Sequence, residues 1–554
     1  MEMYTKNYPF TNIADMMLSN PMGRAEHEPL FIDAHTGESI TLFHLRRMVG
    51  SIHFGLNKLG LKKGDTVCLY SPNNHDIFDV QINMAPIYIG VMSAGMTISP
   101  ANTSYVTSEL QRQLEVSEAK ILISHPNNLD TAFEAAAAAG LPRSNIFSVI
   151  HDPKKRVPIW SDILIDYNEP ELSPIKLTHD ESVNTTAYLC FSSGTTGNSK
   201  GVMTSHYNCI AMVQESNTFS GIFADPSVKK IIAGVIPLYH FSGIHRVFNV
   251  GIAQGATTII VEKYSVTTVC EVIQRFKVTD LPSAPPIIIH LVNNPKVDKY
   301  NLSSLRTLTC GSAPIAPSVV TRFHEKFNHA ALLQGYGMTE VSPAITYQLP
   351  SFARPDSVGR LVPMMKAKIV DENGNELGNN EAGELLVKGP NVMLGYKDDN
   401  ESTANAIDKD NWLHTGDILK RDEEGNYYIV DRIKELIKYK GFQVAPVELE
   451  SILMQCPYVA DAGVIGVYDE AQGTELPLAF VVLPESYKSQ SNSLPEKINI
   501  WVDKRVANHK RLRGGVRIID EIPKNPAGKI LRKNMKRIYE KQQKELFGDR
   551  VSKL

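Results

Sequence analysis

The stretch Tyr188-Leu-Cys-Phe-Ser-Ser-Gly-Thr-Thr-Gly-Asn-Ser-Lys-Gly-Val202 decides how the rest of the chain is interpreted. Its apolar run ends at Phe191 in a turn signal, which predicts a buried strand. The loop that follows combines hydroxyl donors, glycines that allow close backbone approach, and one lysine: Ser192, Ser193, Gly194, Thr195, Thr196, Gly197, Lys200 and Gly201. This combination predicts a loop that binds a polyphosphate.

The loop differs from the common nucleotide P-loop, because Gly-x-x-x-x-Gly-Lys-Ser/Thr cannot be aligned with it in any register. A flexible linker is the alternative, since linkers are also rich in glycine and serine. A linker does not normally follow a buried strand directly or carry a lysine placed to meet charge, which favours the phosphate interpretation. Ser205 can cap a helix that includes residues 209–213, so we expect the loop at a strand-to-helix junction.

Composition limits the possible functions. The chain has 554 residues, of which 43% are hydrophobic and 21% charged, so we expect several domains. Its net charge of -3 provides no overall positive field for binding nucleic acid or an anionic membrane. A small-molecule substrate is therefore the default expectation.

Sequence signals also bear on the compartment. The six cysteines are scattered without metal-ligand spacing, which is typical of buried thiols in a reducing compartment. The first residues lack a signal-peptide pattern. The tripeptide Ser552-Lys553-Leu554 matches the peroxisomal address that an import receptor binds, so we expect a peroxisomal location, with the cytoplasm as the fallback. Residues 80–108 carry no charge but are interrupted by glycines and prolines, which predicts a buried helix and strand rather than a membrane span.

The pattern of elements changes along the chain. Apolar helices and short strands alternate up to about residue 359, which predicts α/β layers, and several strands end in small polar turns. Hairpins with turns at Asn373-Gly374 and Glu424-Gly425 follow. The expected fold is therefore α/β multidomain. It has a large N-terminal domain (1–431) with layered α/β subdomains and a small β-barrel-like layer, a hinge (432–435), and a small mobile α+β domain (436–554).

Five segments carry a family resemblance. They are the loop 192–201, Gly335-Tyr-Gly-Met-Thr-Glu340, His414-Thr-Gly-Asp417, Tyr428-Ile-Val-Asp-Arg-Ile-Lys434 and Pro523-Lys-Asn-Pro-Ala-Gly-Lys529. Together and in this order they resemble the adenylate-forming superfamily of acyl-CoA synthetases, aryl-CoA ligases and beetle-type luciferases. Residues 436–450 look most similar to the 4-coumarate-CoA ligase branch. The resemblance covers nearly the whole chain.

The resemblance implies an ATP site. A carboxylate that attacks the α-phosphorus of ATP meets another anion, so positive charge and hydrogen-bond donors are needed around the phosphates. By resemblance, Ser192 to Lys200 hold the β- and γ-phosphates, Thr339 contacts the α-phosphate, and Glu340 positions Mg²⁺. The adenosine would be bound by Ser312, Ala313, Pro314, Gln334, Gly335, Tyr336, Gly337, Asp417 and Arg432. A helix-start carboxylate is the structural alternative for Glu340, and a core aromatic for Tyr336.

The resemblance also implies residues for the acid and for CoA. Lys529 looks like the adenylation lysine, Lys434 like the hinge, and His240 like a gate between two half-reactions. CoA would contact Lys263, Lys438, Lys440, Gly441 and Gln443, and the acyl pocket would include Tyr239, Ser242, Gly311, Ser342, Pro343 and Ala344. The structural alternatives are one more charge in a basic tail for Lys529 and a satisfied structural histidine for His240.

The function expected from these residues is an ATP-dependent acyl-CoA ligase. Its substrate would be an aryl or aryl-propenoic acid such as 4-coumarate, or a medium-chain fatty acid. A luciferase-like monooxygenase shares the adenylation step and is the first alternative. An enzyme that loads a carrier protein would need a carrier-domain signature after Lys529, and none follows. A non-catalytic nucleotide-binding scaffold would be expected to lack at least one of Glu340, Asp417, Arg432 and Lys529, and all four are present.

Overall fold

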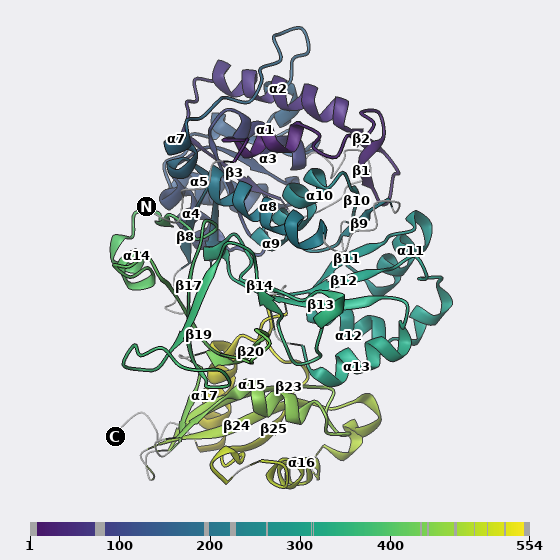
Figure 1. The fold of residues 1–554 in the computed structure, drawn as a ribbon, viewed down its shortest axis with the longest axis vertical. Helices are drawn as coiled ribbons and strands as arrows, with labels where there is room; N and C mark the ends of the chain where they lie inside the picture. The colour runs from purple at the N-terminus through teal and green to yellow at the C-terminus, as the bar shows by residue number, and fades with distance from the viewer. Residues whose placement is uncertain are drawn as a thin grey trace.

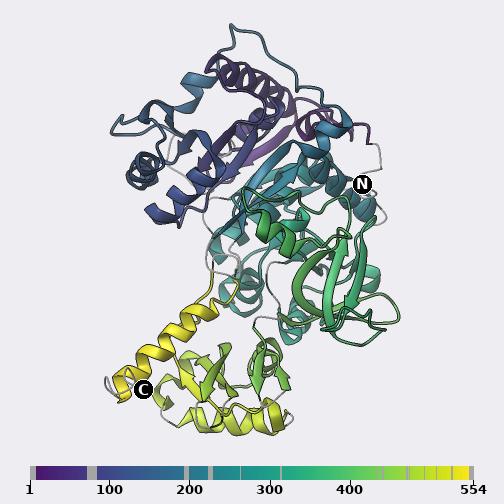
Figure 2. The same cartoon turned by 90° about the vertical axis from the view of Figure 1, so that its left-hand side faces the viewer.

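The computed structural model describes most of the chain: residues 8–71, 84–192, 199–221, 229–261, 264–311, 313, 315–432, 435–439, 442–469, 472, 474–491, 493–506, 508–525 and 528–547. Its helices and strands form a large domain and a smaller domain below it, joined at a narrow junction (Figures 1 and 2). Three sheets lie in the large domain, and two more lie in the small domain. The expected α/β multidomain fold is confirmed.

A nine-stranded sheet forms the central layer of the large domain, in the order β15-β14-β13-β12-β11-β9-β10-β1-β2. Its strands are β1 (Pro29–Asp33), β2 (Ser39–Thr41), β9 (Ile231–Gly234), β10 (Thr257–Ile260), β11 (Asp280–Ser283), β12 (Thr307–Cys310), β13 (Ala331–Tyr336), β14 (Thr346–Tyr347) and β15 (Arg360–Leu361). From β13 to β1 neighbouring strands are parallel. The turns after β12 and β13 therefore meet at one edge, where ligands bind to such sheets.

A seven-stranded sheet lies beside it, in the order β18-β8-β7-β4-β3-β5-β6. Its strands are β3 (Thr66–Tyr70), β4 (Thr97–Pro100), β5 (Ala119–Ser124), β6 (Ile146–Ser148), β7 (Thr186–Ser192), β8 (Lys200–Ser205) and β18 (Gly395–Tyr396). The apolar runs at β3 and β5 are almost entirely buried, as their sequences predict. A third, open antiparallel sheet contains β16 (Lys366–Val370), β17 (Gly383–Lys388), β19 (Leu413–Arg421) and β20 (Tyr427–Arg432).

Helices cover both faces of the two larger sheets. In the large domain they are α1 (Ile13–Leu18), α2 (Leu42–Lys58), α3 (Met84–Ser93), α4 (Thr107–Ser117), α5 (Leu129–Ala138), α6 (Trp160–Leu164), α7 (His179–Asn184), α8 (His206–Gly221), α9 (Phe241–Ile244), α10 (Val250–Ala253), α11 (Val266–Phe276), α12 (Pro285–Asn293), α13 (Pro317–Lys326) and α14 (Asn400–Ala406). None of the helices in the described ranges of the chain combines the length and apolar character that a bilayer span needs.

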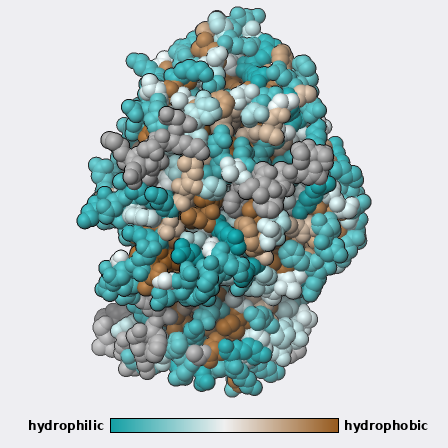
Figure 3. Space-filling model, viewed as in Figure 1, coloured by the Kyte–Doolittle hydropathy of each residue, from teal (hydrophilic) through white to brown (hydrophobic). Residues whose placement is uncertain are grey.

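The small domain packs helices on a three-stranded sheet (Figure 2). It contains β23 (Asp461–Asp469), β24 (Thr474–Val482) and β25 (Gly515–Ile518), with α15 (Pro446–Leu453), α16 (Leu494–Asp503) and α17 (Arg532–Phe547), and a separate hairpin of β21 (Ile437–Tyr439) and β22 (Phe442–Val444). Its core is distinct from those of the large domain. On the face seen in Figure 3 most residues are hydrophilic, and larger hydrophobic areas lie around the junction of the two domains.

The structure corrects one expectation about the phosphate loop. Ser205 does cap a helix, since its Oγ accepts a hydrogen bond from the Asn208 main-chain N at 3.1 Å, and α8 begins at His206. However, β8 runs between the loop and α8 and pairs antiparallel with β7, with Ser192 opposite Lys200. The loop therefore closes a β-hairpin and does not lie at a strand-to-helix junction.

Candidate functional site

The hairpin of β7 and β8 brings Ser192 and Lys200 to the two ends of the phosphate loop. Residues 193–198, which include Ser193, Gly194, Thr195, Thr196 and Gly197, lie outside the described residues. Lys200 is half-buried, and its Nζ lies 4.9 Å from the centre of the Tyr396 ring. The cation is thus held beside the loop by an aromatic face.

Glu340 comes from a different sheet and lies next to this hairpin. It follows β13 in the short 3₁₀ turn η7 (Thr339–Val341), where Thr339 is half-buried and Glu340 is only 5% exposed. Its Oε1 accepts hydrogen bonds from Ser192 Oγ and from the Tyr396 hydroxyl, both at 3.0 Å. Glu340 is therefore a buried carboxylate that two hydrogen bonds hold in place, and not an exposed residue at a helix start.

Tyr396 was not predicted from the sequence. It lies in the two-residue strand β18, opposite Val202 on β8, which places its hydroxyl beside Glu340. Burial and the Glu340 carboxylate raise the pKa of Tyr396 well above its ordinary value, so the hydroxyl stays protonated and donates.

The surroundings of Glu340 fit a magnesium ion. No described residue bonds its Oε2, and no group of three or more acidic, histidine or cysteine side chains forms a metal cage in the described chain. Mg²⁺ commonly binds through one or two carboxylates and completes its shell with waters and substrate phosphates. A single carboxylate beside a phosphate loop therefore has the right chemistry to hold it.

Tyr336 and Asp417 meet at the end of β13. The Tyr336 hydroxyl donates to Asp417 Oδ2 at 2.6 Å, and the two residues are 9% and 7% exposed. Asp417 lies on β19 directly opposite Arg432 on β20, whose side chain is not described. The structure thus joins three of the residues expected to bind adenosine at one place.

Small residues line the adjoining turns. β12 and β13 are neighbours, with Cys310 opposite Gln334, and a Cβ at Gly311 would lie 3.6 Å from the main-chain O of Gly335. A Cβ at Gly337 would lie 2.0 Å from the Pro343 main-chain O, so this position excludes any larger residue. Ala313 is half-buried in the turn after β12, while Ser312 and Pro314 lie outside the described residues.

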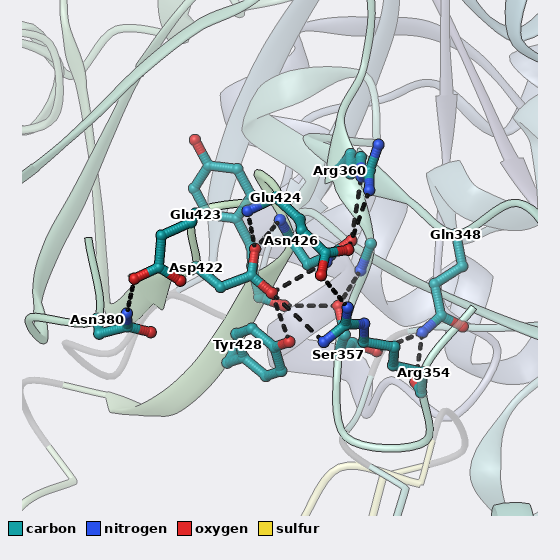
Figure 4. Close-up of polar contacts among 12 residues, drawn as sticks. Gln348, Arg354, Ser357, Arg360, Asn380, Asp422, Glu423, Glu424, Asn426 and Tyr428 are labelled. Atoms are coloured by element: carbon teal, nitrogen blue, oxygen red, sulfur yellow. Dashed lines mark hydrogen bonds and ion pairs between the residues drawn. The ribbon is translucent and has the colours of Figure 1, made fainter. Parts of the chain in front are cut away.

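A network of polar contacts, drawn in Figure 4, connects the end of β13 with the turn between β19 and β20. Gln348 accepts a hydrogen bond from the Gln334 main-chain N at 2.8 Å and donates to the main-chain oxygens of Arg354 at 2.6 Å and Ser357 at 2.8 Å. Arg354 in turn donates to Glu424 in the β19–β20 turn at 2.6 Å. The network therefore connects the β13 turn to the hairpin that carries Asp417.

Asp422 is the acidic centre of the same network, with a side chain only 12% exposed. It accepts hydrogen bonds from Asn426 and from the Tyr428 hydroxyl, at 2.8 Å for the latter. Burial alone would raise the pKa of Asp422, but these hydrogen bonds outweigh it and lower the pKa from 3.8 to about 2. The ionised form is thus favoured in the folded protein.

Replacing Asp422 with asparagine is expected to destabilise the protein in a pH-dependent way. The depressed pKa contributes stability that is present above pH 4 and is lost as the pH falls toward 2. The difference in unfolding free energy between wild type and Asp422→Asn should shrink by about 1 kcal/mol from pH 6 to pH 3 in urea titrations. The exposed Asp410→Asn variant is the control, and a pH-independent difference for Asp422→Asn would contradict the expectation.

His240 lies at the end of a tight turn after β9. A Cβ at Gly243 would lie 2.3 Å from the Pro237 main-chain O, so Gly243 permits α9 to begin immediately after His240. The His240 Nε2 is buried and has no hydrogen-bond partner, and burial lowers the pKa of His240 to about 4. His240 is therefore a neutral imidazole with one unsatisfied nitrogen, unlike a satisfied structural histidine.

The other residues expected around the acyl group differ in exposure. Tyr239, Ser242, Gly311 and Pro343 are half-buried, whereas Ser342 is fully buried and Ala344 packs in a hydrophobic core. Ser342 and Ala344 are therefore packed inside the protein, and the other four residues remain partly accessible.

The segment that carries Lys529 contacts the large domain. Asn525 forms a closed turn with Lys529, in which the Lys529 main-chain N donates to Asn525 Oδ1 at 2.8 Å. A Cβ at Gly528, whose φ is +82°, would lie 2.7 Å from the Pro286 ring at the start of α12. Figure 2 shows the upper end of α17, just beyond this turn, next to the large domain. The turn is therefore pressed against the large domain.

Ion pairs hold this segment on both sides. Lys524 pairs with Asp461 on β23 at 2.6 Å. Arg532, three residues after Lys529, pairs with Glu450 on α15 at 2.9 Å and with Glu435 at 3.4 Å. Because these ion pairs hold the chain on both sides of Lys529, we expect Lys529 to move together with the small domain.

The residues expected to bind CoA are only partly described. Lys438 is exposed in the β21–β22 hairpin opposite Gln443, whose side chain is not described, and its main-chain N donates to Glu475 at 2.8 Å. Four further residues lie outside the described residues: Lys263, Lys440, Gly441 and Lys434, which is expected to be the hinge.

Comparisons with known proteins agree with this arrangement. Residues 21–397 match the model of the AMP-binding enzyme family, and residues 448–529 match that of the AMP-binding enzyme C-terminal domain. The chain is 35% identical to 4-coumarate--CoA ligase 1 of Petroselinum crispum, over 91% of this chain and 90% of that protein. It is 37% identical to peroxisomal OPC-8:0-CoA ligase 1 of Arabidopsis thaliana, over 92% and 90%.

Solved structures share the whole fold. The crystal structure of ATP-bound MatB from Rhodopseudomonas palustris aligns with a TM-score of 0.83 at 26% identity, covering 96% of this chain and 99% of that one. The anthranilate CoA ligase AuaEII in complex with anthranoyl-AMP aligns with a TM-score of 0.85 at 22% identity, covering 98% and 99%, which concerns the fold alone.

Proposed function

The chain belongs to the AMP-binding enzyme family, and we propose that it is an ATP-dependent carboxylic acid-CoA ligase. The carboxylate of the acid attacks the α-phosphorus of ATP, which forms an acyl-adenylate and releases pyrophosphate. The thiol of CoA then attacks the acyl carbonyl, which forms the thioester and releases AMP. The acid is an aryl or aryl-propenoic acid, such as 4-coumarate, or a medium-chain fatty acid. The first class is supported by the relative named 4-coumarate--CoA ligase 1, while the relative named OPC-8:0-CoA ligase 1 acts on a different acid.

One observation carries the proposal most directly: Ser192 of the phosphate loop donates to the buried carboxylate of Glu340, which comes from another sheet. This contact supports a site in which the loop and Lys200 hold the outgoing phosphates and Glu340 lies beside them. Mg²⁺ bound at Glu340 would neutralise charge on those phosphates. Asp417 would accept both ribose hydroxyls, with Arg432 supporting them. The Tyr336 ring would stack against the adenine, which Ala313 borders.

We assign the two half-reactions to two positions of the small domain. Lys529, in the turn that contacts Pro286, would neutralise the carboxylate and the bridging oxygen during adenylation. Rotation at Lys434 within residues 432–435 would then replace it by the β21–β22 hairpin with Lys440, Gly441 and Gln443, while Lys263 meets the CoA phosphates. His240, neutral and unsatisfied, would move aside for the pantetheine arm.

A peroxisomal location belongs to the same proposal. The Arabidopsis relative is named as a peroxisomal enzyme, and Ser552-Lys553-Leu554, which lies outside the described residues, matches an import signal.

A screen of carboxylic acids tests the proposed function. Purified protein with ATP, Mg²⁺ and CoA should release AMP and form a CoA thioester with at least one aryl, aryl-propenoic or medium-chain fatty acid. Omitting CoA should leave pyrophosphate exchange intact and stop thioester formation. If no acid supports either step, the proposal fails, and light from added luciferin and oxygen without thioester would instead support a luciferase-like monooxygenase.

A further inference from the structure

The helical segment after His240 has one accessible side. Phe241 to Ala253 form α9, a π-turn η5 (His245–Asn249) and α10 without a break, at the lower edge of the upper half of the large domain in Figure 1. Within residues 241–250 every residue is buried except Ser242 and Arg246. These two lie four positions apart, so they share one side of the segment.

The guanidinium of Arg246 has no hydrogen-bond or ion-pair partner among the described residues. Its Nε is buried without a hydrogen bond, and across the described ranges no hydrogen bond or ion pair joins its side chain to another residue. Other half-buried arginines in the chain have partners for their terminal nitrogens: Arg24 donates to the Gly255 main-chain O, and Arg532 pairs with Glu450. An unpaired cation in a half-buried position is costly unless something else supplies the counter-charge.

Two neighbours help to place Arg246 in the fold, Tyr347 and Lys230. Burial raises the pKa of Tyr347 and the Arg246 charge opposes this, so the guanidinium lies near the Tyr347 ring. A Cβ at Gly335 would lie 2.7 Å from that ring, which is thus packed against the nucleotide-binding turn. Burial lowers the pKa of Lys230, which lies just before β9, and the charge of Arg246 lowers it further. The guanidinium of Arg246 is therefore also near Lys230. Glu215 on α8 also acts on Tyr347, but forms no ion pair with Arg246 within 4 Å in the described structure.

We propose that Arg246 binds a second carboxylate, carried by the acid substrate at the end remote from the carboxylate that is activated. This inference rests on the proposed function and narrows its substrate to acids with a distal carboxylate. The planar guanidinium binds a carboxylate through two parallel hydrogen bonds, and a charged partner compensates the buried cation better than a neutral group. The π-turn that carries Arg246 is a geometry often found at functional sites.

The test compares acids of equal length that end in a methyl group, a ketone or a carboxylate, for example octanoate, 7-oxo-octanoate and octanedioate, together with cinnamate and 4-carboxycinnamate. Wild-type kcat/KM for acid-dependent pyrophosphate release should be at least about tenfold higher with the second carboxylate. In Arg246→Leu the value for the dicarboxylic acid should fall about 10- to 100-fold, while that for the neutral acid stays level or rises. Arg246→Lys should restore some of the preference, and Arg275→Leu, which removes an exposed cation on α11, should leave it unchanged.

Each outcome separates this inference from the proposed function. Wild-type preference for the methyl- or ketone-terminated acid would overturn the role of Arg246 and leave the ligase function standing. Equal losses for neutral and dicarboxylic acids in Arg246→Leu, with the fold intact by circular dichroism, would also overturn it. Failure of every acid in pyrophosphate release would refute the proposed function itself.

Discussion

Lys529→Ala is expected to lose acid-dependent pyrophosphate release by a factor of about 10³ and still convert a supplied acyl-adenylate and CoA into the thioester. The reason is that Lys529 lies in the turn that contacts Pro286 and is proposed to act only while that contact exists. Two assays on one protein preparation measure the steps separately: pyrophosphate exchange for the first, and thioester formation from synthetic adenylate for the second.

Lys533→Ala is the matched control, because Lys533 is an exposed cation four residues further along the same basic segment. It should leave both steps within about twofold, as for an ordinary surface charge. Equal losses of both steps in Lys529→Ala would show that the residue has no step-specific role. A loss in Lys533→Ala as large as in Lys529→Ala would favour the alternative of a general basic tail.

Glu340→Gln should show the second large effect, a decrease in adenylation of about 10²- to 10³-fold. Glutamine preserves the shape and can still accept hydrogen bonds from Ser192 and Tyr396 through its carbonyl oxygen. It removes the negative charge and replaces the open Oε2 by an NH₂ group, which is a donor and cannot bind a cation. The Mg²⁺ concentration that gives half-maximal pyrophosphate exchange should therefore rise.

The variant Tyr396→Phe tests the hydrogen bond to Glu340 separately from the charge of Glu340. It removes one donor to Oε1 and keeps the carboxylate, so adenylation should fall by no more than about tenfold with little change in the Mg²⁺ requirement. If Glu340→Gln is slow but needs no more Mg²⁺ than wild type, Glu340 does not position the metal.

Local sequence patterns predicted many elements correctly. The helical apolar spacing of residues 42–58 matches α2, and the short apolar runs at β3 and β5 match buried strands. The Asn373-Gly374 turn lies in the connection between β16 and β17, and the Glu424-Gly425 turn closes the hairpin of β19 and β20. These elements are defined by side-chain periodicity and by glycines at positive φ, which are local properties.

Elements that depend on distant partners were missed. The strand β11 contains Pro282, which makes it resemble a rigid loop, but parallel neighbours on both sides hold it in the sheet. α17 is a strongly polar helix, so its sequence resembles a charged tail. The strand β8 was not predicted, because Lys200 and Gly201 at its start belong to the motif of the phosphate loop.

Residues of the candidate site also divide into those predictable from local sequence and those that depend on distant neighbours. Residues in family-like motifs, such as Ser192 and Glu340, were named from the sequence, and the fold brings them into contact. Tyr396 and Arg246 carry no motif, since the role of each depends on what packs beside it: a two-residue strand for Tyr396 and a π-turn for Arg246. Sequence alone does not specify such tertiary neighbours.

The hairpin that ends at Ser192 and Lys200 also determines where this site can change in evolution. An insertion between these two residues lengthens only the tip, because the pairing of β7 with β8 begins at Ser192 and Lys200 themselves. One residue inserted after Lys200 would shift the alternation along β8 and turn the fully buried Val202 and Thr204 toward the opposite face of the sheet. The loop can thus vary in length and stiffness among related chains, while the strand behind it is confined to one register.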